Sequence, residues 1–137
     1  SCVICDLDGT ISFFAKKGHR GPFEYDKCDE DDINQPVLVV LRAIRDQNIE
    51  VIFVSGREEA AREKTLVFLS KIGLSHLPLH MRKNGDYRKD CIIKGEILKE
   101  YIIGKYNILF CLDDRNQVVD FYRSIGLTVL QVAPGNF

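Results

Sequence analysis

The chain has 137 residues, of which 45% are apolar, and its formal net charge is −1. This length and composition suit one compact domain over residues 1–137, and the balanced charge argues against a long basic groove for nucleic acid. No apolar run is long enough to cross a bilayer and no secretory signal is evident, so we expect a cytoplasmic protein with no membrane partner.

The five cysteines include no Cys-x-x-Cys pair and no Cys/His cluster that would suggest zinc. Four of them lie in apolar runs or at a helix start, and we expect buried thiols in a reducing compartment. Cys28 is different because it stands in the acidic segment Asp26–Asp32. We expect that segment to be a solvated turn and Cys28 to be a surface thiol.

The first apolar run, Cys2–Cys5, predicts a buried strand, and Asp6-Leu7-Asp8-Gly9-Thr10 follows it directly. Both carboxylates would then face a crevice at the carboxyl end of the strand. One could attack phosphorus while the other protonates the leaving oxygen. On this motif alone, an Asp-Gly turn before a helix cap is an equal alternative, and a calcium loop is a weaker one.

A second apolar run, Ile49–Val54, ends in Ser55-Gly56-Arg57-Glu58. A hydroxyl, a glycine amide and a guanidinium at a strand end can form a phosphate cradle. Taken by itself, Ser55 is more often the cap of the helix that begins near Arg57.

The segment Arg82–Lys94 is basic and enters a predicted helix. We expect most of its charges to be solvated, and one lysine near the helix start to reach a phosphate. A third apolar run, Asn107–Leu112, ends in Asp113-Asp114. These two aspartates could cap a helix, or they could form with Asp6 an oxygen-rich site for Mg²⁺.

Periodicity and end signals predict helices over residues 35–48, 58–72, 90–103 and 116–125, and further strands over 77–81 and 127–132. Alternation of strands and helices predicts an α/β fold with three Rossmann-like layers, in which helices cover both faces of a mostly parallel sheet. Residues 11–34 form an insertion in this scheme.

Asp6-Leu7-Asp8-Gly9-Thr10, Ser55, Lys94 and Asp113-Asp114, in this order and at strand ends, resemble the four motifs of the haloacid dehalogenase (HAD) superfamily of phosphohydrolases. A closer likeness covers nearly the whole chain and includes Gly85-Asp86-Tyr87-Arg88-Lys89-Asp90. This likeness is to the phosphatase domains of polynucleotide kinase/3′-phosphatases of the bacteriophage type. The resemblance implies that the insertion, about residues 11–34, is a small cap that leaves an open site suited to a polymer end.

The resemblance implies a phosphatase that removes 3′-phosphates from DNA or RNA ends through an aspartyl phosphate, with Mg²⁺ or Mn²⁺ as cofactor. Asp6 would be the nucleophile and Asp8 the general acid and base, with Lys94 as the third catalytic residue. The metal would be held by the Asp6 carboxylate, the Asp8 main-chain carbonyl and Asp114.

The other expected site residues contact the substrate or support the residues that do. Ser55, Gly56, Arg57 and Thr10 are assigned to the phosphate site, with Thr10 as a hydrogen-bonding neighbour of the nucleophile. Arg82 and Arg20 are candidate contacts to the nucleotide. Asp113 would orient metal-bound water, and Asp90 would orient Lys94.

No Gly-x-x-x-x-Gly-Lys-Ser/Thr loop occurs in the chain, so a kinase or ligase domain of the natural protein would lie outside it. Two alternatives remain open. The first is a small-molecule phosphomonoesterase of the HAD superfamily, and the second is a module that binds nucleic-acid ends without catalysis. The sequence leaves the preference for DNA or RNA and the oligomeric state undecided.

Overall fold

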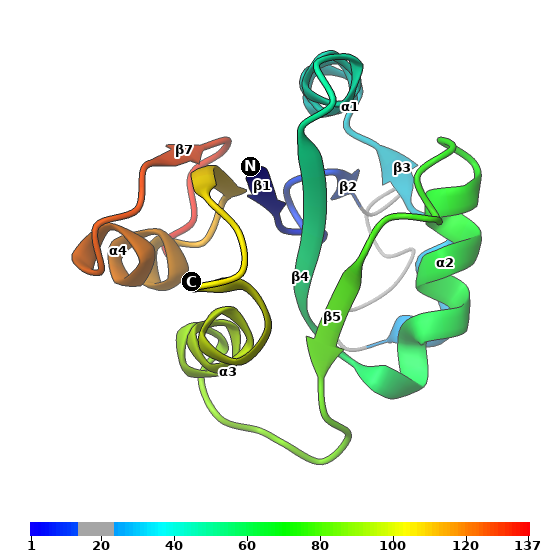
Figure 1. The fold of residues 1–137 in the computed structure, drawn as a ribbon. Coiled ribbons are helices and arrows are strands. Elements are labelled where there is room, and N and C mark those ends of the chain that lie inside the picture. Colours follow the sequence, from blue (N-terminus) through cyan, green and yellow to red (C-terminus); the bar gives the residue numbers. More distant parts are fainter. Residues whose placement is uncertain (14–23) are drawn as a thin grey trace.

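The computed structural model describes residues 1–13 and 24–137. Its main sheet has five strands in the order β5-β4-β1-β6-β7, and all neighbouring strands are parallel (Figure 1). The strands are β1 (Cys2–Cys5), β4 (Glu50–Glu58), β5 (Leu79–Arg82), β6 (Ile108–Asp113) and β7 (Val129–Gln131). The α/β fold with a parallel sheet is therefore confirmed.

Helices cover both faces of this sheet (Figure 1). The helices are α1 (Gln35–Asp46), α2 (Arg62–Ser70), α3 (Asp90–Ile97) and α4 (Asn116–Ser124). In the central strand β1, Val3 and Cys5 join the core under α1 and α2, whereas Cys2 and Ile4 join the core under α3 and α4. A strand that is covered on both faces has to be apolar throughout, which explains the run of residues that predicted β1.

The first predicted helix, 35–48, agrees with α1, which has Pro36 in its first turn and is followed by Asn48 at a φ of 60°. The second prediction, a helix from residue 58, starts too early. β4 continues through Glu58, and a 3₁₀ turn, η2 (Glu59–Ala61), precedes α2. β4 pairs with β5 at both Ser55 and Glu58, with a shift in register between them. This pairing keeps the chain extended beyond the apolar run.

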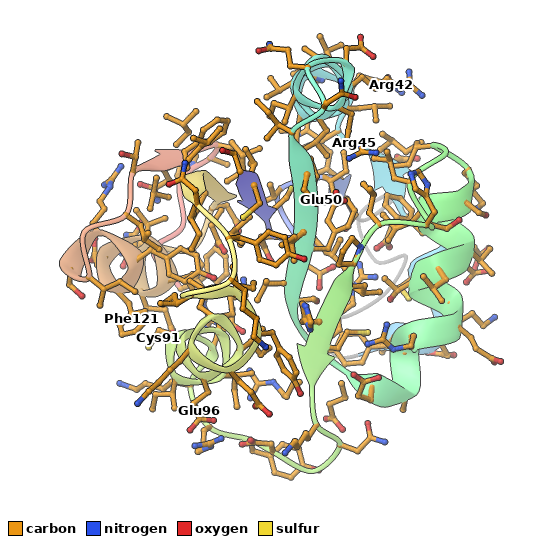
Figure 2. The ribbon with its side chains drawn as sticks, viewed as in Figure 1. Arg42, Arg45, Glu50, Cys91, Glu96 and Phe121 are labelled. Carbon is orange, nitrogen blue, oxygen red and sulfur yellow. The ribbon has the colours of Figure 1, made fainter. Side chains whose placement is uncertain are left out.

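The third predicted helix, 90–103, divides into α3 and a π-helical turn, η3 (Leu98–Ile102). Cys91 on α3 and Phe121 on α4 border the core that these two helices cover (Figure 2). The predictions for α4 and β7 agree with the structure to within two residues at each end. No helix of the described residues is long and apolar enough to cross a membrane.

The described part of the insertion consists of β2 (Ser12–Phe13), the 3₁₀ helix η1 (Tyr25–Glu30) and β3 (Asp32–Ile33). β2 pairs with β3 in antiparallel fashion, and η1 packs against α2. The expected surface thiol is wrong, because Cys28 is fully buried and its Sγ lies 3.8 Å from the Thr65 Oγ1. The expected solvated turn is wrong for Asp31, which is buried because it forms an ion pair with Arg57.

Candidate active site

The site begins where β1 ends. The Asp6 N–H donates to the Leu112 carbonyl at 3.0 Å, which continues the pairing of β1 with β6, and the chain then turns at Gly9 with a φ of 81°. A Cβ at Gly9 would lie 2.1 Å from the Asp114 Oδ2. Two reasons therefore require glycine at this position: the left-handed backbone and the close approach of Asp114.

Asp6 is buried, and both of its carboxylate oxygens accept hydrogen bonds. Lys94 Nζ donates to Oδ1 at 2.8 Å, and the Thr10 hydroxyl donates to Oδ2 at 3.1 Å. Burial first, and then the charge of Asp113, raise the pKa of Asp6 well above its usual range, against the opposing effect of Lys94. The two hydrogen bonds fix the orientation of the carboxylate at the strand end.

Lys94 extends from α3 into the same cluster, and its side chain is buried. Besides Asp6, its ammonium contacts Asp113 Oδ2 at 2.9 Å and Asp90 Oδ2 at 3.5 Å. Burial lowers the pKa of Lys94, but the carboxylates of Asp113, Asp6 and Asp90 outweigh this effect and hold the pKa well above its ordinary value. The lysine is thus a permanent positive charge that joins β1, α3 and β6.

Carboxylate oxygens of Asp6, Asp113 and Asp114 lie within 4.8 Å of one another. Asp113 Oδ1 accepts from the Arg115 N–H at 3.1 Å, and the Asp114 carbonyl accepts from the Gln131 side chain at 2.9 Å. Burial is the largest cause of a raised pKa at Asp114. Three buried carboxylates opposite a single lysine leave excess negative charge, and these oxygen ligands fit a hard divalent cation. Asp113 thus joins the expected ligands Asp6 and Asp114, whereas the Asp8 carboxylate lies outside this group.

The guanidinium of Arg57 lies somewhere other than we expected. Its side chain is fully buried and holds the Asp8 carboxylate with two hydrogen bonds, Nη2 to Oδ1 at 2.7 Å and Nε to Oδ2 at 3.1 Å. It also contacts Asp31 Oδ2 at 3.1 Å and donates to the Thr65 and Ser12 hydroxyls. The assignment of Arg57 to the phosphate is therefore corrected: its side chain is fully buried, and its guanidinium binds Asp8 and the groups behind it.

Ser55 and Gly56 form the adjoining wall. The Ser55 hydroxyl is buried and accepts a hydrogen bond from the Arg57 N–H at 3.0 Å. A Cβ at Gly56 would lie 2.1 Å from Asp90 Oδ1, so the absence of a side chain lets Asp90 approach β4. Asp90 in turn contacts Lys94 on the next turn of α3, and its role in orienting Lys94 stays a prediction.

Arg82, at the end of β5, has most of its donors engaged with the chain itself. It donates from Nε to the Gly56 carbonyl at 2.8 Å and from Nη1 to the Asp86 and Arg88 carbonyls. Its Nη2 lies 3.4 Å from Asp90 Oδ1. Arg82 is thus held at the rim of the site, where it lines the cavity, and its contact with the nucleotide stays a prediction. Arg20 lies outside the described residues.

A cavity of about 260 Å³ opens above these groups. It is lined by Asp6, Asp8, Tyr25, Gly56, Arg82, Asp90, Asp114, Arg115 and Phe137. The sequence predicted site residues at three separate strand ends, and in the structure residues from all three line one cavity. Sequence reasoning missed Asp31 and Thr65, which support Arg57, and Gln131, which supports Asp114. They lie in a loop, on α2 and at the end of β7, where the residue patterns carry no signal for such contacts.

Comparisons with known proteins agree with this geometry. The family model for the polynucleotide kinase PNKP phosphatase domain matches residues 1–137. A protein of Autographa californica nuclear polyhedrosis virus, with the provisional name bifunctional polynucleotide kinase/RNA ligase, is 29% identical over 134 residues, or 95% of this chain and 19% of that protein.

Solved structures give the same result. Chains in two structures of the Pnkp1/Rnl/Hen1 complex, an RNA repair complex, are 47% and 48% identical, each with a TM-score of 0.93 over 99% of this chain. The match covers 47% and 43% of those chains, so the present chain spans less than half of their length.

A class C acid phosphatase from Bacillus anthracis is 15% identical, with a TM-score of 0.68 over 98% of this chain and 66% of that one, and it shares the fold. The chain is a phosphoric monoester hydrolase with the HAD fold, and it belongs to the family of polynucleotide kinase PNKP phosphatase domains.

Proposed function

We propose that the chain is a Mg²⁺-dependent 3′-phosphatase that heals DNA or RNA ends through an aspartyl phosphate on Asp6. One observation carries the proposal: Asp6, Asp8 and Asp114 line one cavity in a chain that matches a polynucleotide kinase phosphatase domain over its full length. In this proposal residues 1–137 form one phosphatase unit, and the insertion at about 11–34 is its small cap.

In the first step, an oxygen of the Asp6 carboxylate attacks phosphorus, and the bond from phosphorus to the 3′ oxygen breaks. Asp8 donates its proton to that oxygen, so that the substrate leaves as an alcohol. In the second step, Asp8 takes a proton from water, whose oxygen attacks phosphorus, and the bond from phosphorus to the Asp6 oxygen breaks. Inorganic phosphate then leaves, and both carboxylates return to their starting state.

The supporting residues hold these two carboxylates. Lys94 and Thr10 fix Asp6 through its two oxygens, and Arg57 fixes Asp8 through both of its oxygens. A divalent cation would be held by Asp6, Asp114 and Asp113, with the Asp8 main-chain carbonyl as an expected further ligand. When bound, it would reduce the repulsion between the anionic nucleophile and the phosphate.

We infer that a kinase or ligase activity belongs to other parts of the same natural protein or complex. The viral relative is named a polynucleotide kinase/RNA ligase, and the solved complex is named for RNA repair. Both names mention RNA, so RNA 3′-phosphates are the first substrates to assay beside the DNA ends of equal sequence.

The test compares a 3′-phosphorylated oligonucleotide with its 5′-phosphorylated form, each as RNA and as DNA, in the presence of Mg²⁺. We expect hydrolysis of the 3′ form and little hydrolysis of the 5′ form. Sugar phosphates serve as the control panel. Equal rates on 3′ and 5′ ends, or better turnover of sugar phosphates, would overturn the end-healing assignment and favour the small-molecule phosphatase.

A further inference from the structure

A second cavity, of about 480 Å³, adjoins the candidate active site. The two cavities share five lining residues, which are Tyr25, Gly56, Arg82, Asp90 and Arg115. A group that extends outward from the Asp6 and Asp8 carboxylates can therefore pass along this common wall into the outer cavity. We call the outer cavity, with its further lining residues Glu58, Asp86, Tyr87, Arg88, Lys89 and Gln117, the outer groove.

The outer groove has an exposed aromatic ring at its rim. Tyr87 lies in the loop between β5 and α3, and the residue is 84% exposed. An exposed tyrosine contributes little to the stability of the fold, because a ring stabilises the fold by being buried. A ring in this position can stack on a nucleobase, since every base presents a flat π face.

The loop that carries Tyr87 is fastened on both sides of that residue. Arg82 Nη1 donates to the Asp86 carbonyl at 2.9 Å and to the Arg88 carbonyl at 2.6 Å. Arg88 bridges Asp86 and Glu96 with contacts of 2.8 and 2.7 Å. Glu96 lies on α3 (Figure 2). The loop therefore presents Tyr87 and Lys89 in a fixed position, so little ordering is needed on binding.

The charges of the outer groove leave one lysine available. Arg88 is neutralised by Asp86 and Glu96, and Arg82 faces Asp90. Lys89 is exposed, and in the described part of the chain it has no ion-pair partner. One unpaired ammonium can neutralise one phosphodiester, and this agrees with a protein that has no overall positive charge.

We propose that the outer groove binds the nucleoside and the 5′-side phosphodiester that adjoin the scissile 3′-phosphate. Tyr87 stacks on the base, and Lys89 contacts the internucleotide phosphate. The inference rests on the proposed function and specifies its substrate: a dinucleotide 3′-phosphate or a longer strand, in preference to a nucleoside 3′-monophosphate. Neither Tyr87 nor Lys89 takes part in the chemistry, so both are specificity residues.

The experiment measures kcat/KM for a dinucleotide 3′-phosphate, a nucleoside 3′-monophosphate and p-nitrophenyl phosphate, in the natural protein and its variants. We expect Tyr87→Ala to lose about tenfold or more on the dinucleotide, since stacking on one base has an effect of this order. We expect Lys89→Ala to lose several-fold on the same substrate and to reduce the slope of log kcat/KM against log salt by about 0.7. Both variants should keep the wild-type rate on p-nitrophenyl phosphate.

Lys105→Ala and Tyr106→Ala are the matched controls. These residues precede β6, so they lie at the edge of the sheet opposite the strand ends that form the site, and they are exposed. We expect both controls to match the wild type on all three substrates, and an equal loss in Tyr106→Ala would overturn the role of Tyr87.

Three outcomes of this experiment bear on the outer groove and on the proposed function. Turnover of both 3′-phosphates at equal kcat/KM, unchanged by Tyr87→Ala and Lys89→Ala, overturns the outer groove and leaves the 3′-phosphatase intact. Turnover of p-nitrophenyl phosphate without turnover of either 3′-phosphate overturns both. A loss confined to the dinucleotide supports both.

Discussion

Arg57 and Asp8 form a two-point contact between β4 and the turn after β1, with the guanidinium Nη2 and Nε on the two carboxylate oxygens at 2.7 and 3.1 Å. The arginine side chain is fully buried, whereas that of Asp8 is 36% exposed. Asp31 and the neighbouring hydroxyls hold the guanidinium from behind. The contact therefore fixes the direction in which the Asp8 carboxylate faces the cavity.

We expect Arg57→Lys to impair proton transfer to the leaving oxygen, because an ammonium cannot hold both Asp8 oxygens. The value of kcat/KM should fall at least about tenfold on a nucleoside 3′-phosphate, whose leaving group needs a proton. It should fall much less on p-nitrophenyl phosphate, whose leaving group departs without one. Equal losses on the two substrates would contradict the positioning role.

The same substitution should lower the free energy of unfolding by about 2 kcal/mol, since it weakens buried ion pairs. Arg45→Lys is the matched control, because Arg45 lies 3.5 Å from Glu50 with side chains 32% and 39% exposed (Figure 2). An exposed pair contributes under about 1 kcal/mol, so the control should change little. Urea unfolding of both variants gives the comparison.

Sequence reasoning placed Asp6 and Asp113 correctly at strand ends, since each follows an apolar run that the sheet buries, whereas Ser55 lies inside β4, which continues to Glu58. The sequence could not show which groups the Arg57 guanidinium binds. One of them, Asp31, is 26 residues away from Arg57 in an insertion without periodicity, and only the folded chain brings the two together.

The same limit explains the misplaced start of α2 and the misassigned thiol. Ser55 lies where a helix cap would be typical, but pairing with β5 keeps the following residues extended. Cys28 stands among acidic residues, yet η1 packs against α2 and buries it. In both cases contacts between segments distant in sequence outweigh the local pattern.

We expect Gly9→Ala to abolish turnover, since its methyl group would collide with the Asp114 carboxylate and displace a candidate cation ligand. Gly73→Ala is the control, because Gly73 has a φ of 72° and, apart from its chain neighbours, no residue within 4 Å of the added carbon. Both variants carry the strain of a left-handed alanine, about 1 kcal/mol. Only Gly9→Ala should lose activity, and a Gly9→Ala protein with wild-type turnover would contradict the contact.

Mg²⁺ should raise the Tm of the wild type and support turnover, and excess EDTA should remove both effects. We expect Asp114→Asn to lose the shift in Tm, because it removes a carboxylate from the group with Asp6 and Asp113. Asp120→Asn, an exposed position on α4, should retain the shift.

Ca²⁺ should support less turnover than Mg²⁺ or Mn²⁺, since its coordination is looser. Full turnover in EDTA would exclude the metal.

We expect His80 to make the free energy of unfolding depend on pH. Burial first, and then the charge of Arg62, lower the pKa of this imidazole from 6.5, and its ring stacks on Tyr101 at 4.6 Å. The unfolded chain therefore binds the proton more readily than the folded chain. The contribution is present above pH 6.5 and is lost as the pH falls through the lowered folded pKa. We expect His80→Gln to lose less stability than the wild type between about pH 7.5 and about pH 5.5, by urea unfolding. Parallel curves would contradict the shift.

The last prediction concerns the nucleophile. We expect Asp6→Asn to lose turnover by at least about a thousandfold while the fold survives, because an amide is a poor nucleophile and Lys94 keeps its contact with Asp113 at 2.9 Å. Asp46→Asn, an exposed position at the end of α1, is the control and should keep full activity. Acid quench of the wild type during turnover of a labelled 3′-phosphate should trap one acyl phosphate, which hydroxylamine releases. The label should map to the peptide that contains Asp6 and should be absent in Asp6→Asn. Substantial turnover by a folded Asp6→Asn protein, or label on Asp8 in its place, would remove the covalent mechanism at Asp6. A folded and inactive Asp6→Asn protein without trapped label, beside a labelled wild type, would assign the acyl phosphate to the carboxylate that Lys94 and Thr10 hold.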